Sequence, residues 1–122
     1  MFSDVLDKEE DRMNLIRDML MTLTKREENV LRLYFGIEGK RLSLAEIGHD
    51  FDITQDSVRR IKNKGVLKMI HRVTKYEPFI YYFSSEVDKD LIARCIDKRK
   101  SKLFDEFMVK LLKIDWEEWV LK

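Results

Sequence analysis

The sequence predicts an all-helical (all-α) fold, and three observations lead to that prediction. Apolar residues recur at three- and four-residue spacings along most of the chain, which is the period of an amphipathic helix. The 122 residues include four Gly and one Pro, which leaves little material for hairpins. Charged residues make up 39% of the chain and apolar residues 44%, a balance that suits helices with one buried and one solvated face.

The N-terminal part of the chain predicts two helices. The first covers about Ser3–Met21 and carries an apolar stripe. The second should cover Lys25–Phe35, because Thr24 and Glu27 have the spacing of a capping box, in which each side chain satisfies a free backbone N–H of the other residue. Gly36 is expected to end this second helix in the usual terminating role of glycine.

The centre of the chain predicts a short helix, a tight turn and a longer helix. Ser43 and Glu46 repeat the capping-box spacing and start the short helix over Leu44–Asp50. A three-residue turn follows, and Thr54 caps the longer helix, which runs to about Arg72. This order of elements is typical of a helix-turn-helix.

Two glycines, Gly48 and Gly65, fall inside these predicted central helices. Glycine costs up to about 1 kcal/mol relative to alanine in a helix interior, so its presence there indicates a packing role. We therefore expect another helix to cross closely at Gly48, and we expect Gly65 to mark a close-packing point or a local bend.

The longer central helix is strongly basic, although the whole chain carries a formal net charge of only +1. From Thr54 to Arg72 a single acid, Asp56, stands against six basic side chains: Arg59, Arg60, Lys62, Lys64, Lys68 and Arg72. Nucleic-acid binding responds to a local basic surface of this kind rather than to the overall charge. The alternative interpretation is a solvated face of a structural helix bundle.

The chain after residue 72 has a different character. Apolar spacing between residues 86 and 113 predicts one or two further helices, followed by a short helical, aromatic tail. The apolar run Phe79–Phe83 fits either a short strand or the first turns of a helix. We expect the aromatic side chains to form the core of this extension, with a protein-binding surface or stacking on unpaired bases as alternatives; they are Tyr81, Tyr82, Phe83, Trp116 and Trp119.

Several function classes find no support in the sequence. One cysteine cannot form an intrachain disulfide, so Cys95 is expected to be a small buried side chain in a reducing compartment. His49 and His71 lack zinc-ligand spacing, and we expect no metal, cofactor or catalytic set, hence no enzyme. The longest apolar run is far shorter than a membrane span, and the N-terminus lacks the pattern of a signal peptide. The prediction is a soluble cytoplasmic protein with no membrane partner.

The sequence LTKREENVLRLYFGI, the loop after it and the helix-turn-helix segment resemble region 4 of bacterial RNA polymerase sigma factors of the housekeeping class. The nearest competitor is the response-regulator type of helix-turn-helix, but the FGI sequence and the loop length favour the sigma type. The matching positions are Leu23, Thr24, Arg26, Glu27, Val30, Leu31, Phe35, Gly36, Ile37, Leu44, Glu46, Ile47, Gly48, Phe51, Ile53 and Thr54. The resemblance implies that the last helix binds the −35 promoter element and that the module attaches to the flap of the polymerase β subunit.

The resemblance also suggests roles for individual residues. The candidates for contact with DNA base edges are Gln55, Asp56, Arg60 and Asn63. The candidates for contact with DNA phosphates are Arg59, Lys62, Lys64, Lys68 and Arg72. Arg60 is a candidate for both kinds of contact. The candidates for contact with the polymerase lie on the second helix and are Leu31, Arg32, Tyr34 and Phe35.

The predicted DNA-reading positions depart from the family pattern T-R-E-R-[IV]-R-Q-I. By residue type Gln55 matches adenine, Asp56 matches the amine of cytosine and Arg60 matches guanine. Phosphate contacts position a protein on DNA, whereas base contacts specify the sequence. We therefore expect DNA attachment to be kept, together with a different target sequence or a loss of specificity.

The expected organisation is an N-terminal helix at 1–22, the sigma region 4-like helix-turn-helix at 23–72 and a C-terminal helical extension at 73–122 that fits partner binding. The acidic residues before Leu23 do not supply the promoter-melting region of a complete sigma factor. Three interpretations follow. The chain is one part of a split sigma factor that works with a second sigma-like subunit, or it is a regulator that occupies the flap site. The third interpretation is a fragment, although Met1 and the extension argue against it. A different class is an anti-sigma-like interaction adaptor that keeps the fold without reading DNA.

Overall fold

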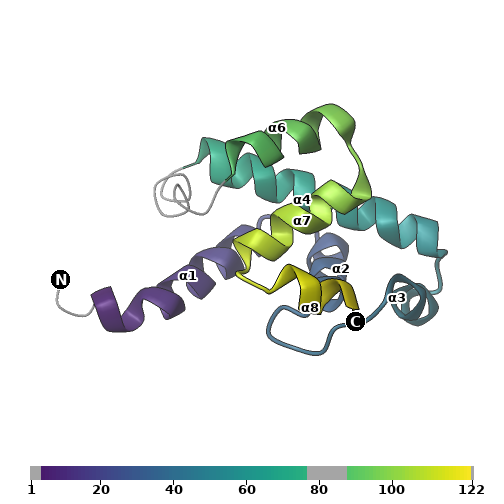
Figure 1. Cartoon of the computed structure of the whole chain (residues 1–122). Helices are drawn as coiled ribbons and strands as arrows, with labels where there is room; N and C mark the ends of the chain where they lie inside the picture. Colours follow the sequence, from purple (N-terminus) through teal and green to yellow (C-terminus); the bar gives the residue numbers. More distant parts are fainter. Residues whose placement is uncertain (1–3, 77–87, 122) are drawn as a thin grey trace.

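A computed structural model describes residues 4–76 and 88–121 of the chain, with side chains in the first helix described from Glu10 onward. Every regular element in those residues is a helix, which confirms the all-helical prediction (Figure 1). The apolar run Phe79–Phe83, which includes the aromatic residues Tyr81, Tyr82 and Phe83 named above, lies outside the described residues. The helices are α1 (Asp4–Leu20), α2 (Lys25–Phe35), α3 (Leu44–Phe51), α4 (Gln55–Lys75), α6 (Lys89–Lys98), α7 (Ser101–Leu111) and α8 (Trp116–Leu121).

The starts and ends of the central helices follow the local signals in the sequence. Both predicted capping boxes form, with Thr24 and Glu27 at the start of α2 and an equivalent pair at the start of α3. The Thr54 hydroxyl accepts from the backbone N–H of Ser57 at 3.1 Å and starts α4. Gly36 ends α2 at φ 68°, a left-handed conformation that glycine adopts without a steric penalty.

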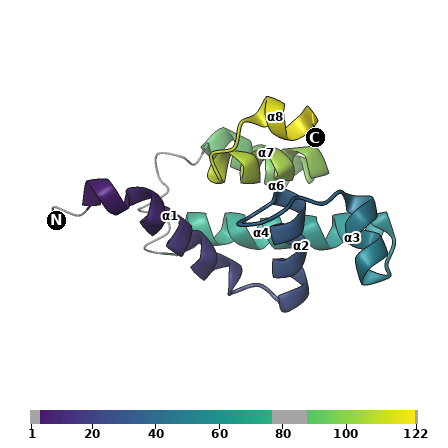
Figure 2. The ribbon, with the colours of Figure 1, turned by 90° about the horizontal axis from the view of Figure 1, so that it is seen from below.

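The long helix α4 forms the centre of the structure. Figure 2 shows α1, α2 and α3 against one part of its surface, while α7 lies along another, with α6 and α8 beside α7. Val58, Val66 and Met69 of α4 are completely buried in the shared core. Arg12 of α1 is buried too, and it donates to the backbone oxygen of Leu111 at 2.5 Å, which ties α1 to the end of α7.

The two glycines inside helices are both close-packing points, but for different reasons. A Cβ at Gly65 would lie 3.2 Å from Leu31 Cδ1, so Gly65 brings α4 close to α2, as the close-packing alternative predicted. A Cβ at Gly48 would lie 2.7 Å from the carbonyl oxygen of Ile53. The backbone of the turn after α3 therefore approaches Gly48 most closely, and the backbone N of Gln55 at the start of α4 would lie 3.6 Å from the same Cβ.

The C-terminal extension folds back onto the helix-turn-helix. Trp119 of α8 is 7% exposed and contacts two aromatic rings of α2, stacking on Phe35 at 5.7 Å and meeting the edge of Tyr34 at 5.4 Å between ring centroids. Trp116 is half-buried and stacks on Trp119. Trp119 therefore belongs to a core that the extension shares with α2, as the core interpretation of the aromatic residues favoured. Cys95 is buried, as predicted.

Candidate nucleic-acid interface

Helices α3 and α4 and the turn between them form a helix-turn-helix. Asp52 adopts a left-handed φ of 57°, and the backbone N–H of Ile53 donates to the carbonyl oxygen of Gly48 at 2.9 Å. Ile47 of α3 and Val58 of α4 are fully buried and hold the two helices together. This arrangement leaves one face of α4 uncovered over its first three turns.

The uncovered face of α4 carries the predicted base-reading residues. Gln55, Asp56 and Arg60 are exposed, and Asn63 is half-buried. Asp56, Arg60 and Asn63 follow the three- and four-residue spacing that brings side chains to one face of a helix, and Lys64 lies next to them. The side chain of Arg60 is 79% exposed.

Asp56 forms ion pairs with two basic side chains on this face. Its Oδ2 atom lies 2.6 Å from Nη2 of Arg60, and its Oδ1 atom lies 3.3 Å from Nη1 of Arg59. Both pairs are one helical turn apart and largely exposed, so each contributes well under about 1 kcal/mol to stability. Their larger consequence is electrostatic, because an acid within the basic face weakens its attraction for phosphate.

The expectation that Lys62 contacts DNA phosphate needs correction, because this side chain is fully buried. Its Nζ atom lies 2.7 Å from Oδ1 of Asp105, which belongs to α7. The same atom donates to Oγ and to the backbone oxygen of Ser101, the first residue of α7. Burial lowers the pKa of the Lys62 ammonium group, and the adjacent Asp105 opposes that shift. The other carboxylate oxygen of Asp105 accepts from the Tyr34 hydroxyl at 2.8 Å.

The remaining phosphate candidates differ in whether another side chain of the protein already binds them. Lys68 is 2.8 Å from the buried carboxylate of Glu27, and Arg72 donates to the Thr22 hydroxyl at 3.0 Å. Lys64 is exposed, and no ion pair to it occurs among the described side chains of residues 10–76 and 88–121. Of the predicted phosphate contacts, Lys64 is thus the most available in this structure.

The predicted polymerase face on α2 is largely covered. Leu31, Tyr34 and Phe35 are buried at 0%, 8% and 2% exposure, so these three residues lack the open surface that direct contact with a partner needs. Two contacts cover these side chains: Gly65 of α4 packs on Leu31, and Trp119 of α8 packs on Tyr34 and Phe35. Arg32 remains partly exposed, and it pairs with Glu28 and Glu38.

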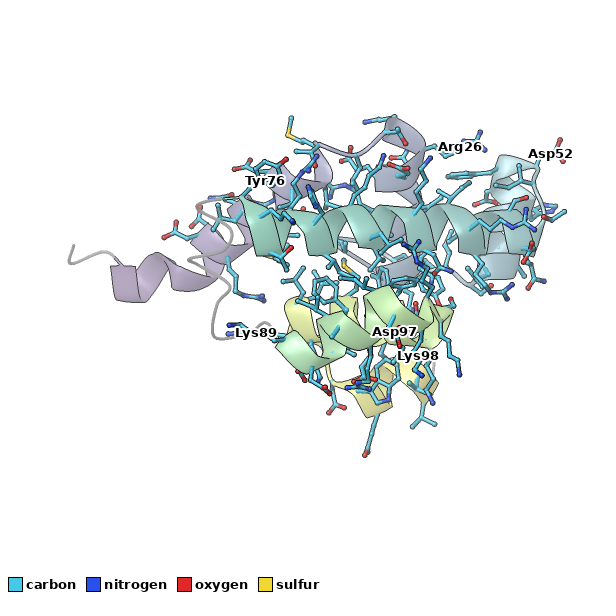
Figure 3. The ribbon with its side chains drawn as sticks, turned by 90° about the horizontal axis from the view of Figure 1, so that it is seen from above. Arg26, Asp52, Tyr76, Lys89, Asp97 and Lys98 are labelled. Atoms are coloured by element: carbon cyan, nitrogen blue, oxygen red, sulfur yellow. The ribbon has the colours of Figure 1, made fainter. Side chains whose placement is uncertain are left out.

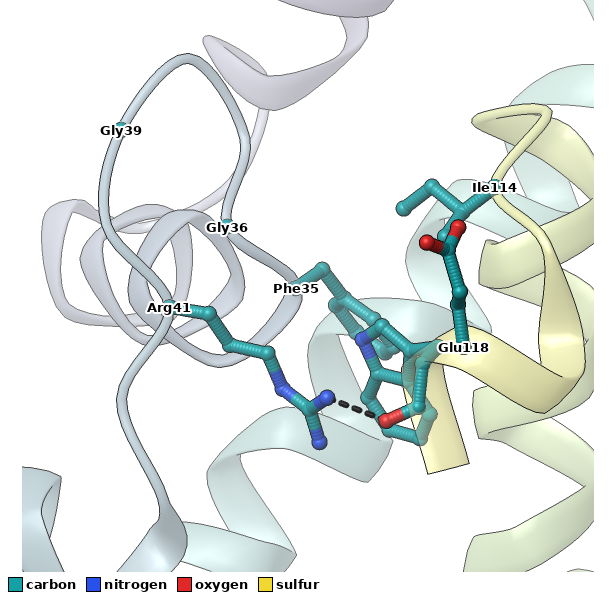
Figure 4. Close-up of a pocket in the computed structure, with 7 residues that line it drawn as sticks. Phe35, Gly36, Gly39, Arg41, Ile114 and Glu118 are labelled. Carbon is teal, nitrogen blue, oxygen red and sulfur yellow. Dashed lines mark hydrogen bonds between the residues drawn. The ribbon is translucent and has the colours of Figure 1, made fainter. Parts of the chain in front are cut away.

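Arg41 holds α8 in place beside α2, a role that was not predicted from the sequence. Its guanidinium carbon lies 3.8 Å from the centroid of the Trp119 ring, and it donates a hydrogen bond to the backbone oxygen of Trp119 (Figure 4). A cavity of about 280 Å³ opens beside this contact. Its lining residues are Phe35, Gly36, Gly39, Arg41, Ile114, Glu118 and Trp119. No local pattern marks Arg41, because its partner lies 78 positions away.

Two negative findings hold for the described residues. No cluster of three or more His, Cys, Asp and Glu side chains that suits a metal ion occurs there, and His49 and His71 are both exposed. No described helix has the length and apolar character needed to cross a membrane.

The fold and the open face of α4 define a DNA-binding helix-turn-helix module. Residues 19–71 match the family of sigma-70 region 4, and this part of the chain is a sigma-70 region 4 domain. That finding confirms the resemblance, and helices α6 to α8 lie outside the matched range.

Known relatives share this module. The chain is 46% identical over 57 residues to RNA polymerase sigma factor SigA of Bacillus sp, and equally so to the SigA proteins of Listeria monocytogenes and Listeria innocua. The match covers 46% of this chain but only 15% of the length of each relative. No solved structure matches the chain.

Proposed function

We propose that this chain acts in transcription initiation, binding promoter DNA through α4 and RNA polymerase through its sigma-70 region 4 domain. The observation that carries the proposal is the coincidence of the matched residues, 19–71, with an intact helix-turn-helix whose second helix is open. In this role the chain is one part of a split sigma factor or a sigma-like regulator.

The DNA-binding part of the proposal rests on the open face of α4. A recognition helix reads the major groove with three or four side chains near its N-terminus. Gln55, Asp56 and Arg60 lie in the first two turns of α4, and Asn63 and Lys64 follow in the next turn. These residue types differ from the family pattern, so we propose a target sequence other than that of the housekeeping factors.

The polymerase-binding part needs a surface other than the one that the resemblance implied. Arg32 is the only one of the four candidates on α2 with appreciable exposure, and α8 lies over Tyr34 and Phe35. We propose that the polymerase contacts the domain beside Arg32 while α8 stays bound. In the alternative route, α8 leaves α2 and the polymerase takes its place on the aromatic pair.

A non-enzymatic interaction adaptor, anti-sigma-like or occupying the flap site, is the second candidate function. One observation favours it: Asp56 occupies a base-reading position and pairs with both Arg59 and Arg60, which reduces the positive charge of the DNA-facing surface. An adaptor of this kind keeps the fold and the polymerase contact without reading a DNA sequence.

Retention on core RNA polymerase, followed by footprinting of promoter DNA with and without the chain, tests the proposal. We expect the chain to be retained by the polymerase and to change the pattern of DNA protection. Retention without any change in protection would overturn promoter binding and favour the adaptor. Loss of both would overturn the proposed function altogether.

A pair of variants in α8 separates the two routes of polymerase binding. Trp119→Ala removes the side chain that covers α2, whereas Leu121→Ala changes an exposed residue of the same helix. If α8 stays bound in the complex, Trp119→Ala is retained no better than Leu121→Ala. Stronger retention of Trp119→Ala alone would show that α8 competes with the polymerase.

A further inference from the structure

Four of the seven Lys and Arg side chains of α4 form ion pairs within the protein. Asp105 and Glu27 pair with two of its lysines, and Asp56 is shared by two of its arginines. Lys64 lies on the open face, and the side chains that the structure describes, in residues 10–76 and 88–121, form no ion pair with it. This helix alone therefore offers a duplex less positive charge than its sequence suggests.

A denser group of open basic side chains lies in the extension, at the connection between α6 and α7. We call it the basic turn, and its members, all exposed, are Lys98, Arg99, Lys100 and Lys102. No acid interrupts residues 98–102. In the described part of the chain, the one ion pair to this group is a distant contact of 3.8 Å between Lys98 and its neighbour Asp97.

Direct contacts hold the basic turn beside α4. Ser101 lies between the lysines at 100 and 102, and its Oγ atom accepts from Nζ of Lys62 at 2.5 Å. The same hydroxyl donates to Oδ1 of Asn63 at 3.3 Å, and the backbone oxygen of Ser101 accepts from Lys62 at 3.2 Å. Asn63 is adjacent to Lys64, so the basic turn borders the open face of α4.

The backbone of the basic turn is fixed from its other side as well. Arg99 adopts a left-handed φ of 52°, and its N–H donates to the carbonyl oxygen of Cys95 at 3.0 Å. The Cys95 thiol is fully buried and donates to the carbonyl oxygen of Leu103 at 3.3 Å. The turn thus has a defined position relative to α4, and only its long side chains have to adjust to a ligand.

Figure 3 looks onto α4 with α1 and α2 behind it, and α6 and α7 lie alongside. A helix seated in the major groove has a phosphate backbone along each of its sides. Duplex DNA carries about one negative charge per 1.7 Å of its axis, so several closely spaced cations can each contact a phosphate.

We infer that the basic turn binds the sugar-phosphate backbone of the duplex that α4 enters.

This inference rests on the proposed function, and it assigns a role to the extension: electrostatic attachment that adds to the weakened attraction of the ion-paired bases of α4. The contact is to phosphates, so it carries no sequence information itself. It therefore adds affinity on any duplex, and its test does not depend on the unknown target sequence.

Titration of a 30-base-pair, mixed-sequence duplex at several salt concentrations, followed by fluorescence anisotropy, tests the inference. The turn variant is Lys100→Gln with Lys102→Gln, and the matched control is Lys89→Gln with Lys110→Gln, which removes two exposed charges from the ends of α6 and α7 away from the turn. We expect the turn variant to reduce the slope of log K against log salt by about 2 and to weaken binding roughly tenfold at physiological salt. The control should behave like the wild-type chain.

A charge-preserving variant, Lys100→Arg with Lys102→Arg, should restore the wild-type slope. The reference variant Lys64→Gln on α4 distinguishes failure of the inference from failure of the proposed function. If Lys64→Gln lowers the slope and the turn variant does not, the inference is overturned and DNA binding by α4 stands. If the wild-type chain shows no salt-dependent binding, both are overturned. If the turn variant is no longer retained on core polymerase but keeps the salt slope of the wild-type chain, the basic turn binds an acidic protein surface instead of DNA and the inference is overturned.

Discussion

Lys62 and Asp105, 43 positions apart in the sequence, form a buried ion pair with 2.7 Å between Nζ and Oδ1. It joins α4 to α7 at the point where the extension meets the sigma region 4 domain, and the Tyr34 hydroxyl completes the cluster from α2. Removing one partner from such a pair leaves an uncompensated buried charge, whereas replacing both partners with neutral residues is often tolerated.

The first prediction follows from that pair. Asp105→Ala should lower the free energy of unfolding by about 3 to 5 kcal/mol in urea titrations. Lys62→Met combined with Asp105→Asn should recover most of the loss, because it removes both charges and keeps an acceptor for Tyr34. Asp90→Ala, which breaks an exposed pair with Arg94, serves as the control and should cost less than about 1 kcal/mol. Equal losses for Asp105→Ala and Asp90→Ala would contradict the role of the buried pair.

The second prediction concerns acid stability. Burial raises the pKa of Glu27, but hydrogen bonds from Lys68 and from Thr24 outweigh it and bring the pKa below the usual 4.5. Because the folded-state pKa is the lower one, the contribution of Glu27 is fully present above the unfolded pKa and is lost as the pH falls through the folded-state pKa.

Glu27→Gln provides the test of that linkage. Glutamine can keep the capping contact with Thr24 but loses the charge opposite Lys68. We expect a loss of roughly 1 kcal/mol at neutral pH and a shallower decrease of stability below about pH 4.5 than in the wild-type chain, measured by urea unfolding across pH. Parallel stability profiles of the two proteins over that range would count against the assignment.

The third prediction concerns the turn of the helix-turn-helix. Gly48→Ala gains about 1 kcal/mol of helix propensity, but its Cβ would lie 2.7 Å from the backbone oxygen of Ile53. We expect a net loss of about 1 to 3 kcal/mol in thermal or urea unfolding, together with weaker DNA binding. Gly39→Ala is the control: its Cβ would lie 3.9 Å from the carbonyl oxygen of Ile37, an ordinary contact distance, so the substitution should be close to neutral. A stabilised Gly48→Ala protein would show that the turn moves away freely.

The fourth prediction separates charge from sequence reading on α4. Asp56→Asn releases Arg59 and Arg60 from their shared carboxylate and removes a negative charge from the DNA-facing surface. Binding to a mixed-sequence duplex should strengthen several-fold at physiological salt, because phosphate attraction dominates non-specific binding. Unchanged or weaker binding in an anisotropy titration would mean that Asp56 does not face the DNA.

Local signals allowed the helices of the sigma region 4 domain to be predicted from the sequence. A capping box acts over three residues, so Thr24 with Glu27 and Ser43 with Glu46 specify helix starts that no distant contact has to supply. Gly36 likewise ends α2 through its own backbone conformation. The same locality explains why the family resemblance and the helix-turn-helix were predictable together.

The candidate site was predictable only in part, because burial depends on partners far away in the chain. Lys62 lies in a run of basic residues that looks solvated, and its partner Asp105 belongs to an extension without a recognised family. Tyr34 and Phe35 have the spacing of an ordinary apolar face, and nothing near them in the sequence indicates that Trp119 covers them. The exposed α4 residues needed no such partner, and their positions followed from helix geometry alone.

The central claim is that the open face of α4 reads promoter DNA, and selection of binding sequences from a random duplex pool tests it most directly. The chain should be used with core RNA polymerase, once as wild type and once as Arg60→Ala. We predict an enriched sequence for the wild type, and loss of preference at one position for Arg60→Ala, at a cost of about 1 to 3 kcal/mol. The absence of any enriched sequence, or identical preferences for the two proteins, would contradict sequence reading by α4.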